Sequence, residues 1–170
     1  MKTSIVVIFI STLFLYSCKD SATDTNQQVN GFAIYKLADT TLRTSRILDV
    51  PLDSLVLASS PFLTIKDIKA YYWSTHLFVT NSQIDSEFSR MKYWGGQSSG
   101  MPFVVVVNQS RIYLGTFWWP YSSSMPQVPF IMVDAPPPYW IKGDYIGTTP
   151  DKRNDPRIYE ALLSTGVLQE

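Results

Sequence analysis

The sequence predicts an α+β domain in which two or three short helices pack on a mostly antiparallel sheet. The strongest observation is the segment 103–107, a Phe followed by four Val residues, which is typical of a central strand buried on both faces. A second observation is that three other segments carry apolar residues at helical spacing. Together the signals follow the order β-β-α-β-α-β-β-β-α, which favours helices packed on such a sheet.

Six segments are predicted to be strands, because they are rich in β-branched, aromatic or other apolar residues. They are 31–35, 52–57, 76–80, 103–107, 111–117 and 128–133. Pro51 would set the start of the second strand. Asn108, Gln109 and Ser110 are typical of a turn, so the fourth and fifth strands should form a hairpin.

Two helices are predicted in the middle of the chain. The first follows Thr64, a suitable N-cap, and has Asp67 in its first turn. Its apolar residues, spaced i, i+3 and i+7, are Ile65, Ile68 and Tyr72. The second can be capped by Asn81 or Ser82. Its apolar residues, spaced i, i+4 and i+7, are Ile84, Phe88 and Met91.

The last predicted helix has the clearest boundaries. Asp155 stands at its N-cap, Pro156 at its first helical position and Gly166 just beyond its C-terminal end. Helices favour proline just inside the start and glycine just past the end. The inner face is expected to consist of Ile158, Ala161 and Leu162.

The segment 76–133 resembles the periplasmic head subdomain of SecD-type export proteins, with a strand, an amphipathic helix, a Val-rich strand, a tight turn and a strand ending in Gly115. This resemblance covers about a third of the chain and implies at most a shared fold, because the multi-span membrane region needed for export is lacking. The chain also looks like small uncharacterised bacterial envelope lipoproteins, a likeness that implies no activity. Its matching positions are 31–35, Asp67-Ile68, His76, 102–107 and 111–118.

The start of the chain has the organisation of a lipoprotein signal peptide. Lys2 precedes a largely apolar run at 5–15, which suits a signal peptide and is well short of the ~20 residues that a membrane-spanning helix needs. Leu15-Tyr16-Ser17-Cys18 then resembles the site where lipoprotein signal peptidase cuts before a lipidated cysteine. Cys18 is the only cysteine, and it stands where the apolar run ends.

We therefore expect residues 1–17 to be a cleaved signal peptide, Cys18 to carry lipid and 18–30 to be a polar tether. Residues 31–170 would form one domain with an extended C-terminal segment and a terminal helix. An ordinary secretory signal, or a short anchor with a coincidental cysteine, is the alternative. Each buried methylene contributes ~0.8 kcal/mol, so the several acyl chains of a bacterial lipoprotein would hold the domain durably to a membrane, outside the cytoplasm.

The charge of the chain argues against a nucleic-acid partner. There are 14 Lys and Arg residues against 14 Asp and Glu, and removing 1–17 takes away only Lys2, which leaves 13 against 14 and a net charge of −1. Nucleic-acid binding and electrostatic attachment to anionic lipid both need a basic surface. We therefore expect neither.

Residues suited to catalysis are few. The segment 96–100 matches the Gly-x-Ser-x-Gly pattern of a nucleophile elbow, in which Ser98 would be the nucleophile. That mechanism needs a strand, a sharp turn and a helix in this order, whereas here a strand follows the motif. The only histidine, His76, also precedes Ser98, against the order of that fold. A structural role is the commoner outcome for a histidine at the start of an apolar strand.

Metal ligands are equally scarce. With one histidine and no free cysteine, the chain lacks the ligand pattern of a zinc site. Asp151, Asn154 and Asp155 offer oxygen atoms, but their spacing is not that of a calcium loop. A solvated loop that caps a helix is the simpler interpretation, and we expect no metal and no other cofactor.

Aromatic residues gather in and after a Pro- and Ser-rich segment that follows the fifth strand. The candidate binding residues are Trp118, Trp119, Tyr121, Tyr139 and Trp140. Neighbouring side chains of an extended chain point to opposite sides, so one of the two adjacent Trp residues should be anchored inward and the other exposed. Exposed Trp and Tyr are typical of binding surfaces. The alternative is that these rings pack on one another.

We interpret the chain as a non-enzymatic envelope lipoprotein whose domain binds a partner, such as an envelope protein. A glycan-binding lipoprotein, with Trp119 and Tyr121 as stacking platforms, is a second hypothesis. A serine hydrolase using Ser98 and His76 is a third, and hydrogen-bond contact between the two would favour it. Flat, coplanar, exposed rings would favour a glycan, and a convex apolar patch would favour a protein.

Overall fold

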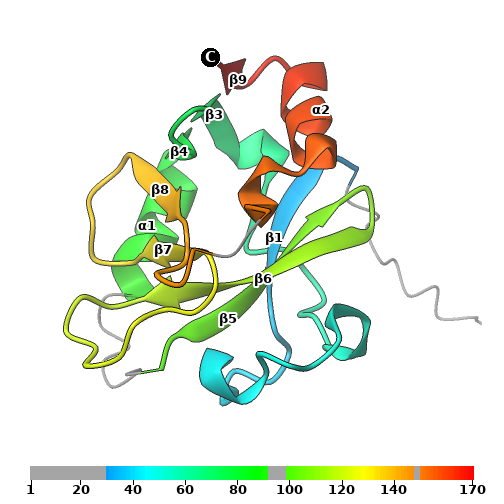
Figure 1. Ribbon diagram of the computed structural model, residues 1–170. Helices are drawn as coiled ribbons and strands as arrows, with labels where there is room; N and C mark the ends of the chain where they lie inside the picture. Colours follow the sequence, from blue (N-terminus) through cyan, green and yellow to red (C-terminus); the bar gives the residue numbers. More distant parts are fainter. Residues whose placement is uncertain (1–29, 92–98, 148–149) are drawn as a thin grey trace, which may run out of the picture.

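One sheet of nine strands organises the described part of this computed structural model, residues 30–91, 99–147 and 150–170 (Figure 1). The strands are β1 (Phe32–Lys36), β2 (Leu63–Thr64), β3 (Ile68–Tyr72), β4 (Leu77–Thr80), β5 (Met101–Val107), β6 (Ser110–Trp118), β7 (Phe130–Met132), β8 (Tyr139–Lys142) and β9 (Leu168–Gln169). They pair in the order β2-β1-β5-β6-β7-β8-β4-β3-β9, and only the β6–β7 and β3–β9 pairs are parallel. The prediction of a mostly antiparallel sheet is therefore confirmed.

Two α-helices, α1 (Ser82–Met91) and α2 (Pro156–Ser164), are present among the described residues. Four short 3-10 turns accompany them: η1 (Thr44–Arg46), η2 (Leu52–Ser54), η3 (Ile65–Asp67) and η4 (Lys152–Asn154). The described chain is therefore richer in strand than the expected α+β arrangement.

The central strand β5 separates two apolar clusters. Val105 and Val107 belong to the cluster that contains the inner faces of both helices, whereas Val104 and Val106 belong to a second cluster covered by residues 37–57. All four Val side chains are at most 6% exposed, which confirms that this strand is buried on both faces. Since a buried aliphatic side chain contributes ~1.5–3 kcal/mol, β5 is a principal source of stability.

The β5–β6 hairpin forms where it was predicted. Asn108 and Gln109 both adopt positive φ, at 46° and 72°, as the two central residues of a tight hairpin turn require. The Asn108 side chain also accepts a hydrogen bond from the Gly31 backbone N at 2.7 Å, which holds the start of β1 against the turn. Further along β6, a Cβ at Gly115 would lie 2.3 Å from the Phe103 ring, so glycine permits this ring to cross the strand.

Both helices have the predicted apolar faces, and all six residues named for them are buried. Asn81, and not Ser82, is the N-cap of α1, because its side chain accepts a hydrogen bond from the Ile84 backbone N at 3.0 Å. In α2 the Asp155 side chain accepts from the Arg157 backbone N at 2.9 Å. Gly166 follows this helix with a φ of +74°, as predicted for its C-terminal end.

The predicted helix after Thr64 is wrong. Only the single turn η3 forms, and the chain then continues as β3. The Asp67 carboxylate accepts hydrogen bonds from the Thr64 backbone N and hydroxyl, both at 2.8 Å. Thr64 is therefore the N-cap of η3, as predicted, and forms a capping box with Asp67. The helix stops because the residues after Asp67 pair with β4 instead, which buries Ile68 and leaves Tyr72 40% exposed.

The predicted strand at 52–57 is also wrong, because η2 and a loop occupy these positions. Only Leu57 forms a bridge, with Leu37. The Arg111 guanidinium donates hydrogen bonds to the backbone oxygens of Leu52 and Leu55, so these two groups are satisfied outside any sheet. Leu55 is buried, and the segment covers the second face of β5 instead of joining the sheet.

Smaller differences concern strand ends. The strand predicted at 76–80 begins at Leu77, because His76 lies in the preceding turn with a φ of 54°. The strand predicted at 128–133 is reduced to β7. The short strands β8 and β9 were not predicted, since each is two to four residues long and depends on partners distant in the sequence.

Candidate functional site

Both tryptophans of the predicted contact segment are buried, contrary to the expectation that one would be exposed. Trp118, the last residue of β6, is 6% exposed, and Trp119 is fully buried. The two side chains do lie on different sides of the chain, but other residues cover both sides. Trp119 joins the core beneath the helices, and the Trp118 ring packs against Gly100, where a Cβ would come within 2.8 Å of the ring.

The remaining three candidate residues do not form one cluster. Tyr139 is 2% exposed, and its ring stacks on Phe88 of α1 with centroids 4.0 Å apart. Its neighbour Trp140 is 39% exposed, because side chains along β8 alternate between core and solvent. Tyr121 is the most exposed of the five at 62%. Tyr139 and both Trp118 and Trp119 are therefore packing residues in this fold.

An exposed apolar surface nevertheless exists at the loop that follows β6. We call it the loop patch and define it as Tyr121, Met125, Tyr145 and Ile146, which are 62–69% exposed. The Tyr145 ring stacks on Phe130, with centroids 5.8 Å apart and planes 16° apart. Its backbone N donates to the Pro126 oxygen at 3.3 Å, which joins the 143–147 segment to the loop after β6.

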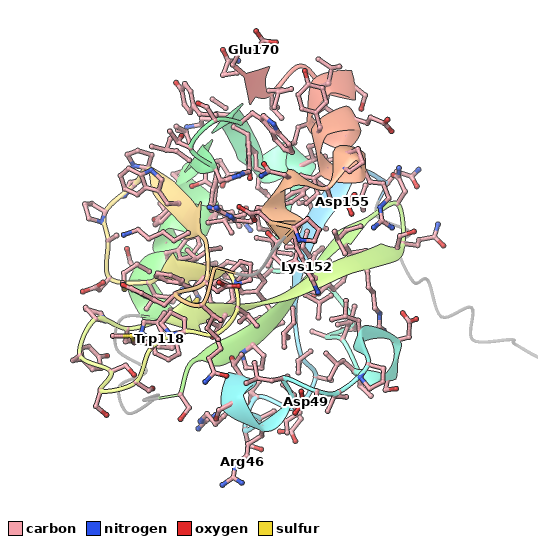
Figure 2. The ribbon with its side chains drawn as sticks, in the orientation of Figure 1. Arg46, Asp49, Trp118, Lys152, Asp155 and Glu170 are labelled. Carbon is pink, nitrogen blue, oxygen red and sulfur yellow. The ribbon has the colours of Figure 1, made fainter. Side chains whose placement is uncertain are left out.

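A cavity of about 310 Å³ lies between these two segments. Among the residues that line it are Trp118, Met125, Pro126, Phe130, Met132 and Tyr145. In Figure 2, Trp118 is seen beside the yellow loop that follows β6. Met125 and Tyr145 of the loop patch therefore line this depression, whose lining is mixed, because Ser122, Ser123 and Ser124 also contribute to it.

Sequence reasoning missed Met125, Tyr145 and Ile146 as candidate contact residues. A usable signal was present for the last two, because Gly143 and Gly147 bracket them in a short segment. Large apolar residues in such a segment have few ways to reach a core.

His76 is a buried structural residue at the turn between β3 and β4. It is 4% exposed, and its Nδ1 atom lies 3.0 Å from the Tyr71 hydroxyl. Burial, followed by the nearby positive charge of Arg153, lowers the pKa of the imidazole from 6.5 to about 4. Ser98 and the rest of its motif up to residue 98 lie outside the described residues, so no contact between Ser98 and His76 can be assigned.

The acidic residues considered as metal ligands are paired with arginines. The Asp151 carboxylate lies 2.5 Å from Arg153, and that of Asp155 lies 2.7 Å from Arg157. Hydrogen bonds from these guanidinium groups lower the pKa of both carboxyls. Within residues 30–91, 99–147 and 150–170, no group of three His, Cys, Asp or Glu side chains is placed to hold a metal ion.

No protein-family model, curated protein or solved structure matches this chain. Neither of the two described α-helices has the length and apolar character needed to cross a lipid bilayer. Cys18 and the predicted signal peptide lie outside the part of the chain that the structure describes.

Proposed function

We propose that this protein is a non-enzymatic lipoprotein of the cell envelope, anchored through Cys18, whose domain binds a protein partner through the loop patch. The observation that carries the proposal is the exposure of four large apolar side chains, each 62–69% exposed, on two segments joined by a hydrogen bond. Two of the four, Met125 and Tyr145, line the same cavity. Large exposed apolar side chains on neighbouring segments are typical of interaction sites.

The composition of the loop patch supports a protein partner over a glycan. Two of its four members are Met and Ile, and aromatic residues and Met are enriched in the cores of protein interfaces. Glycan stacking would use flat exposed rings, and Trp119, one of the two rings considered for that role, is fully buried. Of the two proposed stacking platforms, Trp119 and Tyr121, only Tyr121 is exposed.

The position of the loop patch supports an anchored protein that presents it to a partner. Residue 31, which would follow the tether, is hydrogen-bonded to Asn108 in the turn where β6 begins. The patch lies beyond the other end of this nine-residue strand, about 30 Å away at ~3.3 Å per residue. Figure 1 shows the start of β1 beside the hairpin tip and the yellow loop at the opposite end of the hairpin.

Site-directed photo-cross-linking in living cells tests the proposal. A photoreactive amino acid at position 121 should form an adduct with one defined protein, and the same group at position 72 should not. Tyr72 is a matched control, because it is a partly exposed tyrosine on β3. The adduct should disappear with Met125→Asp and persist with Val56→Asp, since Val56 is 71% exposed outside the patch.

Two outcomes would contradict the proposed contact. Adducts that are equal from positions 72 and 121 would mean that the loop patch has no preferred partner. A carbohydrate adduct from position 121, with no protein adduct, would replace the protein partner by a glycan.

A further inference from the structure

A larger cleft, of about 600 Å³, lies on the face of the sheet away from the helices. Its apolar wall contains Leu48, Val50, Leu52, Leu114 and Val128. Several of these belong to the second apolar cluster around β5, so the cleft opens directly over the sheet. The volume falls within the range of small-molecule sites, which are mostly apolar with a few placed polar groups.

The opposite wall is polar and comes from the segment that includes η4. Arg153 donates through Nε and Nη2 to Asp151, and through Nη1 to the Ile141 backbone oxygen at 2.8 Å. Gly143 permits this arrangement, because a Cβ there would come within 3.1 Å of the guanidinium. The ion pair of Arg153 with Asp151 is therefore fixed to β8, and the two charges offset each other.

Lys152 is the cation of this wall that is left for a ligand. Its side chain lines the cleft and is exposed. Within the described ranges, its ammonium group forms no ion pair or hydrogen bond. Figure 2 shows Lys152 labelled at η4, on the side of the molecule that faces the viewer.

We propose that this cleft binds a small amphiphilic anion, an aliphatic chain that carries a carboxylate. The aliphatic part lies against Leu48, Leu52 and Val128, and the carboxylate pairs with the Lys152 ammonium. This ligand class matches the two walls, because one removes apolar surface from water and the other supplies a positive charge. The cleft and the cavity at the loop patch have no lining residue in common, although Gly143, Asp144 and Gly147 of the cleft belong to the segment that carries Tyr145 and Ile146.

The cleft also contains the carboxylate of Asp144, which would favour a cationic ligand over an anionic one. Its Oδ1 atom accepts a hydrogen bond from the Gly147 backbone N at 2.6 Å. If Asp144 governed the charge preference instead of Lys152, the cleft would select a cationic amphiphile. Comparing octanoate with octylamine and octanol separates the two possibilities, because the three share one chain length and differ in charge.

The test uses the full chain in lipid nanodiscs, labelled with an octanoate analogue that carries a diazirine on its alkyl chain. Mass spectrometry should locate the label in peptides that contain residues 48–52 or 127–129. Unlabelled octanoate should compete, and octylamine and octanol should compete at least about fivefold less well.

Three variants complete the experiment. Lys152→Gln should reduce labelling about fivefold or more, and Lys66→Gln, which removes an exposed lysine at η3, should not. Val50→Asp should also reduce labelling, because it places a negative charge on the apolar wall at a side chain that is already 36% exposed. Label outside the cleft peptides, equal competition by octanol or octylamine, or full labelling of Lys152→Gln would each overturn the proposal.

Discussion

At His76 the fold combines a left-handed backbone with a buried imidazole. The residue has a φ of 54° and is 4% exposed. Its ring contacts Tyr71 by a hydrogen bond and Trp73 edge to face, with centroids 5.4 Å apart. Its backbone oxygen accepts a hydrogen bond from Ile141 at 3.0 Å. His76 therefore joins the β3–β4 turn to β8, and its neutral form is the one that the surroundings favour.

The lowered pKa of His76 predicts a loss of stability in mild acid. Burial and the Arg153 charge lower the folded-state pKa to about 4, although Asp151 and a hydrogen bond with Asn154 partly oppose this. As the pH falls below 6.5, the unfolded chain binds the proton and the folded chain does not. The free energy of unfolding should therefore decrease between pH 6.5 and about 4, by about 2–3 kcal/mol in total.

Urea unfolding across this pH range, compared with the His76→Asn variant, measures the effect. Asn accommodates positive φ better than most residues, so this substitution removes the titrating ring with little backbone strain. The variant should show a much shallower dependence on pH over the same window. Equal slopes for both proteins would mean that His76 titrates normally in the folded state.

The strand β5 is the element on which both apolar clusters depend. Its four valines alternate between the cluster under the helices and the cluster under residues 37–57. Substitutions in this strand should therefore affect packing on whichever face the side chain occupies.

Val105→Asp should lower the free energy of unfolding by more than about 3 kcal/mol, because it buries a carboxylate with no partner. Val105 is fully buried, and thermal or urea unfolding measures the loss. The matched control is Val56→Asp, at a valine that is 71% exposed, which should change stability by less than about 0.5 kcal/mol. A stable Val105→Asp variant would contradict the central position of β5.

For the whole molecule, the tether and the loop patch are expected at opposite ends of the β5–β6 hairpin. Gly31 is tied to the hairpin turn, whereas Trp118 and the patch beyond it lie at the far end of β6. A lipid at Cys18 would thus leave the patch directed away from the attachment point.

Metabolic labelling with an alkyne-bearing fatty acid tests this anchor. Label should appear on the wild-type protein and be absent from Cys18→Ser, which should be released from membranes or persist as uncleaved precursor. Ser21→Ala, three residues further along the predicted tether, is the control and should be labelled normally. An unlabelled wild-type protein would remove the lipoprotein part of the proposed function.

Local signals in the sequence determined the central strand, the β5–β6 hairpin and both α-helices. Runs of valine, a turn that tolerates positive φ, and caps such as Asp155 act within a few residues, so they need no knowledge of distant partners. The spacing of Ile65, Ile68 and Tyr72 was misleading for the opposite reason. An apolar pattern this short suits either a helix or a strand, and pairing with β4 decided between them.

Only the tertiary structure decided which aromatic residues are accessible. The alternation that places Trp118 and Trp119 on different sides follows from the sequence, but their burial depends on what covers each side. The same holds for the cleft at Lys152, whose walls come from residues 48–52, Leu114 of β6, and residues 127–129, 143–147 and 151–153. Such surfaces are formed by segments that are far apart in the chain. The free energy that brings these segments together comes from burying apolar area, which is non-directional, so no short stretch of sequence shows which segments will meet.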